Sequence, residues 1–140
     1  MRDGKSEGVA PAARERERRR KERHRVDLPA RFSLFVPSRP RVRSRSLEAR
    51  TYDISEGGIR LLSAAVQADG LHVLNPATAP CEQCALSIEI ETPAGVLAVC
   101  GQVVWYDRSS PHDIFPFQMG IRFIDVPPEI RERIRELCKR

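Results

Sequence analysis

The 140-residue sequence has no run of about 18 apolar residues, the length that a membrane-spanning helix requires. Its first twenty residues, MRDGKSEGVAPAARERERRR, lack the apolar centre of a secretory signal. We therefore expect a cytoplasmic protein without a membrane span, in which the four cysteines stay reduced. The chain has no HExxH motif and no phosphate-binding glycine loop, and its three histidines are too scattered to suggest a catalytic triad. The residues thus do not indicate an enzyme.

The positive charge of the chain is concentrated at its start. Residues 1–26 contain ten Lys and Arg against five Asp and Glu, whereas residues 27–140 contain fourteen of each. A basic arm on a neutral domain indicates a polyanionic partner, which could be a nucleic acid, a membrane surface or a nucleotide.

The pattern of apolar residues predicts one small domain of mostly β structure. We expect a disordered tail over 1–17 and a domain over 18–140, divided into a flexible basic arm (18–26), a six-stranded antiparallel barrel (27–126) and a C-terminal helix (127–139). The helix follows two prolines and has one apolar face. The apolar positions that carry these predictions are Leu28, Ala30, Phe32, Leu34 and Val36 in the first strand, Leu86, Ile88 and Ile90 in a later one, and Ile130, Ile134, Leu137 and Cys138 in the helix.

Other segments are less regular. Residues 38–55 look like one strand, and Arg39, Arg41, Arg43 and Arg45 form an exposed face on its first half. Residues 66–84 read as a long, turn-rich loop, and Trp105 is most simply a core residue.

The segment TYDISEGGIRLL, residues 51–62, has an unusual pattern for a hairpin. Asp53 and Ser55 lie two positions apart on a strand, so both side chains face outward if Ile54 faces the core. Gly57 and Gly58 permit a positive φ or a close backbone approach. A carboxylate in this position can accept hydrogen bonds from N1–H and N2–H₂ of guanine. The pattern also fits a local turn in which both side chains cap backbone N–H groups.

The arginines of the arm offer a second binding element. Arginine presents a planar fork that matches phosphate oxygens or the O6 and N7 atoms of guanine, and it also stacks on bases. Two arginines four positions apart could contact one anion from two directions. Taken alone, such a run is equally consistent with a solvated tail.

Together, the two elements resemble the PilZ domain family. In that family an RxxxR motif before the barrel and a [D/N]xSxxG motif on it bind the bacterial second messenger cyclic di-GMP. The downstream segments GQVVWYD and MGIRFIDVPPEIRERIREL also resemble the family, and the resemblance extends from about residue 18 to residue 140. It implies a receptor that binds cyclic di-GMP, needs no other cofactor and signals to a protein effector by ordering its arm. The implied binding residues are Arg18, Arg19, Arg23, Asp53, Ser55 and Gly58.

The arm allows two registers of the RxxxR motif. Counting back from Asp27 selects Arg19 and Arg23, and His24 then stands where the family usually has an apolar residue. A shift of two residues selects Lys21 and Arg25, and lysine lacks the bidentate fork.

Three other interpretations remain open. Cys81 and Cys84 form a CxxC pair that could hold a metal or a redox centre, although a zinc site needs a second such pair; Cys84 and Cys100 also suit small core positions. The arm and the arginines of residues 39–45 could bind nucleic acid, but no aromatic residue lies among them to stack on bases. A PilZ-like adaptor that binds no nucleotide is the third interpretation.

Overall fold

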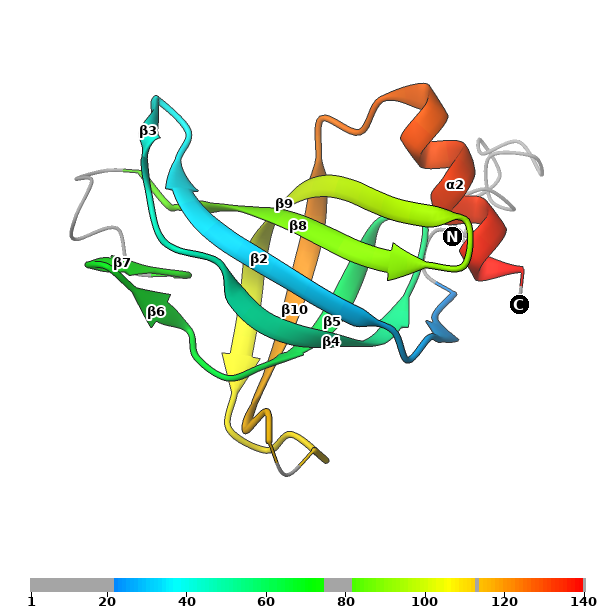
Figure 1. The fold of residues 1–140 in the computed structure, drawn as a ribbon, viewed down its shortest axis with the longest axis horizontal. Helices are drawn as coiled ribbons and strands as arrows, with labels where there is room; N and C mark the ends of the chain where they lie inside the picture. Colours follow the sequence, from blue (N-terminus) through cyan, green and yellow to red (C-terminus); the bar gives the residue numbers. More distant parts are fainter. Residues whose placement is uncertain (1–21, 75–81, 113, 140) are drawn as a thin grey trace, which may run out of the picture.

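The computed structural model describes residues 22–74, 82–112 and 114–139. Six antiparallel strands form a closed barrel in the order β4–β5–β10–β9–β8–β2, because β2 pairs back onto the first half of β4. Figure 1 shows this barrel with its helix at one end. The strands are β2 (Pro29–Val36), β4 (Leu47–Ile54), β5 (Gly58–Ser63), β8 (Ala85–Thr92), β9 (Gly95–Asp107) and β10 (Phe117–Ile124). The predicted six-stranded barrel is therefore confirmed.

Strict alternation of apolar side chains builds the core. In β2 the buried residues are Ala30, Phe32, Leu34 and Val36, and in β8 Leu86, Ile88 and Ile90 are fully buried. Inward side chains from all six strands meet in one cluster. The alternation read from these segments thus predicted the core side of both strands correctly.

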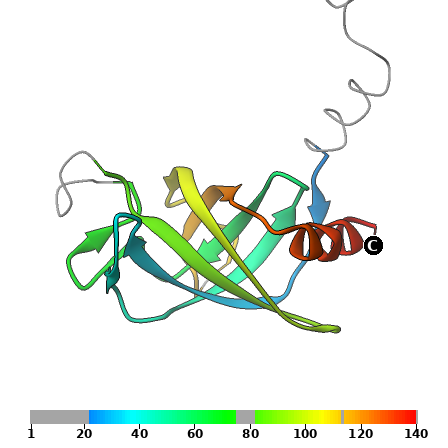
Figure 2. The ribbon, with the colours of Figure 1, turned by 90° about the horizontal axis from the view of Figure 1, so that it is seen from above.

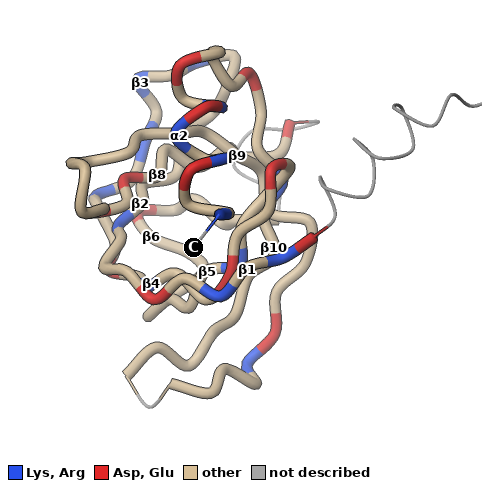
Figure 3. Tube along the Cα trace, turned by 90° about the vertical axis from the view of Figure 1, so that its right-hand side faces the viewer, with Lys and Arg blue, Asp and Glu red and all other residues tan. Residues whose placement is uncertain are grey.

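Helix α2 (Pro128–Cys138) closes one end of the barrel (Figures 1 and 2). It begins with proline in its first turn, and Ile134 and Leu137 are buried against the core. The Arg133 guanidinium donates hydrogen bonds to the carbonyl oxygens of Val96 and Gly95, 3.0 and 3.2 Å away. Both basic and acidic residues occur along this helix (Figure 3). In the described part of the chain, no helix is both long and apolar enough to cross a membrane.

Two short strands extend the barrel at opposite ends. β1 (His24–Arg25) pairs with the second half of β4, and Val26 N–H donates to Tyr52 O. We expected ordered structure to begin at Val26. It begins earlier, at β1, because the open edge of β4 supplies backbone partners for the end of the arm. β3 (Arg39–Arg43) pairs with β2 and is exposed along its whole length.

The prediction of a single strand over 38–55 is wrong, because the strand is interrupted at Ser44. The Ser44 hydroxyl accepts a hydrogen bond from Leu34 N–H at 2.9 Å, and Ser44 N–H donates to Leu34 O at 2.8 Å. One residue thus satisfies both backbone groups of its neighbour, and β3 and β4 lie on either side of it.

The described part of 66–84 is more than a loop. It contains a small hairpin of β6 (Gln67–Ala68) and β7 (Leu71–His72). The apolar side chains of this segment are buried in the barrel core, so the segment covers one end of the barrel. These residues are Val66, Leu71 and Val73.

Candidate functional site

The turn between β4 and β5 is tight. Ser55 N–H donates to Gly58 O at 2.8 Å, and the Ser55 hydroxyl lies 3.4 Å from the same oxygen. Neither Gly57 nor Gly58 has a positive φ. Gly58 is instead required by a close approach, since a Cβ at this position would lie 2.3 Å from Ile121 O on β10. Of the two reasons we gave for the glycines, the structure selects the second for Gly58.

A β-bulge turns Asp53 outward. Thr51 pairs with Leu61 and Asp53 pairs with Arg60, so Tyr52 is an extra residue in β4. If Tyr52 were paired in a regular strand, Asp53 would lie two positions after Thr51 and share its inward face. The bulge therefore gives the predicted arrangement, in which Ile54 is buried in the core and Asp53 lies on the outside of the barrel.

Asp53 is nevertheless buried, because two arginines cover it. Arg23 Nε donates to Asp53 Oδ1 at 2.8 Å. Arg60 Nε contacts Oδ1 and Oδ2 at 3.0 and 2.9 Å, and its Nη2 also bonds Oδ2. The hydrogen bond to Asp53 raises the pKa of the Arg60 guanidinium above its ordinary value. Two positive charges share one carboxylate, so this cluster carries an excess positive charge that favours an anion. Sequence reasoning missed Arg60, although it lies two residues after Gly58.

The two described arginines of the arm have different surroundings. Arg23 reaches the buried carboxylate. Arg25 lies over the Tyr52 ring, 4.2 Å from its centroid, and donates to Tyr52 O. Arg18 and Arg19, and Lys21 of the other register, lie outside the described residues.

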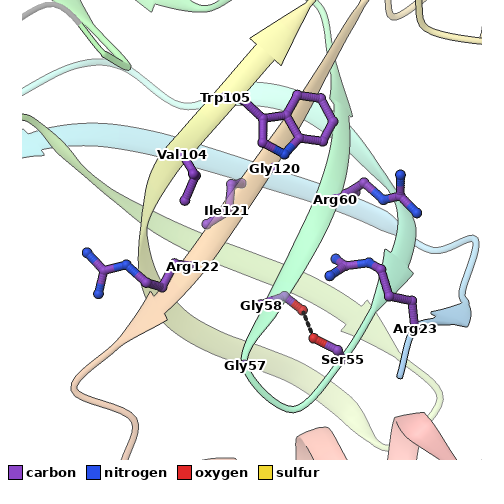
Figure 4. Close-up of a pocket in the computed structure, with 10 residues that line it drawn as sticks. All are labelled: Arg23, Ser55, Gly57, Gly58, Arg60, Val104, Trp105, Gly120, Ile121 and Arg122. Atoms are coloured by element: carbon purple, nitrogen blue, oxygen red, sulfur yellow. Dashed lines mark hydrogen bonds between the residues drawn. The ribbon is translucent and has the colours of Figure 1, made fainter. Parts of the chain in front are cut away.

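A surface pocket of about 470 Å³ lies where the arm, the motif turn and β9–β10 meet (Figure 4). Among the described residues that line it are three arginines and no carboxylate, so the pocket favours an anionic ligand. Its lining residues are Arg23, Ser55, Gly57, Gly58, Arg60, Val104, Trp105, Gly120, Ile121 and Arg122.

The prediction that Trp105 belongs to the core is wrong. Trp105 is 38% exposed and lines the pocket. A second bulge explains the error: Gly120 pairs with Trp105 and Ile121 pairs with Val103, so Val104 is the extra residue in β9. Val103 faces the core, Val104 and Trp105 both face outward, and alternation resumes after them.

The three described cysteines belong to no metal centre. Among the described residues, no group of three or more His, Cys, Asp or Glu could hold a metal ion. Cys81 lies outside the described residues. Cys84 is buried in the core as expected, whereas Cys100 is only partly buried. Cys138 packs against the core from α2, and burial raises the pKa of its thiol to about 11.

The model of the PilZ domain family matches residues 17–140. The chain belongs to the PilZ domain family. No curated protein sequence matches this PilZ domain significantly.

Solved structures share the fold of this PilZ domain at low sequence identity. The PilZ domain with c-di-GMP of YcgR from Escherichia coli has a TM-score of 0.52 and 17% identity, over 84% of this chain and 88% of that one. YcgR in complex with c-di-GMP has a TM-score of 0.51 and 20% identity, over 86% of this chain and 45% of that one. The Borreliella burgdorferi PlzA protein in complex with c-di-GMP has a TM-score of 0.50 and 13% identity, over 88% and 52%. The chain thus spans about half the length of YcgR and PlzA.

Proposed function

We propose that this PilZ domain is a receptor for cyclic di-GMP that acts in the bacterial cytoplasm and relays the signal to a protein effector. The observation that carries the proposal is the pocket where Arg23 of the arm meets the DxSxxG turn, because both elements line one cavity and Arg23 also bonds the motif carboxylate, Asp53. Cyclic di-GMP has two phosphates and two guanines, so it can use both elements. The similar structures of the YcgR PilZ domain and of PlzA hold this ligand.

The ion pairs indicate which contact the ligand replaces. Arg60 contacts both oxygens of Asp53 and lies on a barrel strand, whereas Arg23 contacts one oxygen and lies on the arm. A phosphate that binds Arg23 therefore draws it away from Asp53 while Arg60 stays. The freed Asp53 Oδ1 then accepts from the N1–H and N2–H₂ edge of a guanine, and Ser55 lies beside it.

Binding in this form makes no covalent bond, and it gives the arm a signalling role. Two residue pairs hold β1 on β4, and Arg23 directly precedes β1. Movement of Arg23 therefore changes the position of β1. Arg18 and Arg19 precede Arg23 by five and four residues in the sequence and would bind the same phosphates. The rearranged arm presents a new surface to the effector.

Calorimetric titration of cyclic di-GMP into the purified protein tests the receptor. We expect saturable heat with the wild type and none with GTP. A charge-assisted hydrogen bond contributes about 1.5–3 kcal/mol, so Arg23→Ala should weaken binding about 10- to 150-fold. Arg25→Ala is the matched control, because this exposed arginine lies two residues further along the arm and does not line the pocket.

Each outcome selects one interpretation. Loss of binding in Arg23→Ala but not in Arg25→Ala supports the motif of Arg19 and Arg23. The reverse result supports Lys21 and Arg25. No heat from folded wild type at millimolar ligand refutes the receptor and leaves the adaptor that binds no nucleotide.

A further inference from the structure

Four residues on neighbouring strands form one row across the outside of the barrel. Asp53 pairs with Arg60, Arg60 pairs with Gly120, and Gly120 pairs with Trp105. Strands are about 4.8 Å apart, so the row runs roughly 14 Å from the carboxylate strand to the tryptophan strand. A single nucleobase cannot contact both ends of this row.

Gly120 leaves room for the indole in this row. A Cβ at this position would lie 2.2 Å from Trp105 Nε1 and 2.4 Å from Cε2, so the ring lies across the glycine backbone. Figure 4 shows the indole leaning over Gly120 between β9 and β5, on the same side of the barrel as Arg23 and Arg60. The indole is held against a strand but remains partly open to the pocket.

Exposure of the indole needs a reason, because burial of this apolar ring would stabilise the fold. The bulge at Val104 holds the ring outside, and 60% of Val104 itself is exposed beside it. An aromatic ring beside a cationic groove is the arrangement with which proteins bind single-stranded nucleic acids, whose bases stack on the ring. Arg60 and Arg122 line the same pocket and supply its positive charge.

We infer that Trp105 is the platform of a second base subsite, on which the guanine remote from Asp53 stacks. This inference rests on the proposed function and extends it, because it assigns the two halves of the ligand to opposite ends of the row. One guanine is recognised by its edge at Asp53, the phosphates lie at Arg23 and Arg60, and the other guanine is held by its face at Trp105. The missing side chain at Gly120 leaves the space that the indole occupies.

The lone tryptophan of the chain gives a direct test, since all indole fluorescence comes from this subsite. We would titrate cyclic di-GMP into the wild type and follow indole emission and acrylamide quenching beside calorimetry. Stacking should change the emission and shield the ring from acrylamide, with the same midpoint as the heat. GTP has one base and should do neither at the same concentrations.

Variants supply the second measurement. Trp105→Leu removes the stacked base contact, so this variant should bind cyclic di-GMP about 5- to 100-fold more weakly than the wild type. Trp105→Phe should recover most of the lost affinity. Val96→Ala is the control, because it truncates an exposed side chain of the same strand outside the pocket and should stay within about twofold of wild type.

The outcomes separate the two proposals. Heat without any change in indole emission or shielding, or Trp105→Leu binding as tightly as wild type, overturns the subsite and leaves the receptor standing. No heat from the wild type overturns both. If Trp105→Leu does not fold, the wild-type emission and the Phe variant still decide the question.

Discussion

Replacing Asp53 by Asn tests whether the buried carboxylate holds the site together without ligand. The Asp53 side chain is 4% exposed. It pairs with Arg23 and Arg60, whose side chains are 34% and 31% exposed. Removing one member of a fully buried ion pair costs about 3–5 kcal/mol. Because water reaches a third of each arginine, we expect about 2 kcal/mol of unfolding free energy to be lost. For a domain of this size, the midpoint of thermal unfolding should fall by about 8 °C.

Asp27→Asn is the matched control for this prediction. Asp27 also pairs with an arginine, Arg50, but its side chain is 75% exposed, so its loss should cost less than about 1 kcal/mol. Urea unfolding followed by circular dichroism measures both variants without the ligand. If Asp53→Asn loses no more stability than Asp27→Asn, the carboxylate does not hold the two arginines in place, and our account of the ligand-free site is wrong.

Three further predictions concern the turn, the hairpin and the helix. Gly58→Ala should lower the unfolding midpoint and weaken cyclic di-GMP binding, because the added Cβ meets Ile121 O at 2.3 Å; thermal unfolding and calorimetry would measure both. Burial lowers the pKa of His72, whose Nδ1 accepts from Leu74 N–H, so urea stability should be full above about pH 6.5 and fall as the pH drops below it; His72→Asn, which retains an acceptor, should flatten this dependence. Burial raises the pKa of the Cys138 thiol to about 11, so mass spectrometry at pH 8 should find slow alkylation of native Cys138 that urea accelerates.

The strands and the helix could be predicted because their patterns are local. Phe32, Leu34 and Val36 alternate along one strand, and Ile134 and Leu137 recur at helical spacing, so each segment carries its own evidence of which side is buried.

The site was only partly predictable, because its shape depends on pairings between distant strands. The pairing of Arg23 with Asp53 joins residues thirty positions apart, and the motif resemblance suggested that these two residues act together. Nothing in GQVVWYD signals that Val104 is an extra residue, since a bulge is defined only against the partner strand. Alternation from Val103 therefore placed Trp105 on the wrong side of the sheet.

The two bulges make the site depend on the length of a strand as well as on its composition. Inserting one residue between Arg60 and Leu61, opposite Tyr52, would keep Asp53, Ser55 and Gly58 in the sequence, with the DxSxxG spacing intact. The insertion would nevertheless give Tyr52 a partner, remove the bulge and place Asp53 on the inward face with Thr51. A chain of this fold could thus carry every residue of the motif and have no site. A search for such receptors by motif alone would accept that chain, whereas counting residues between the paired positions of neighbouring strands would reject it.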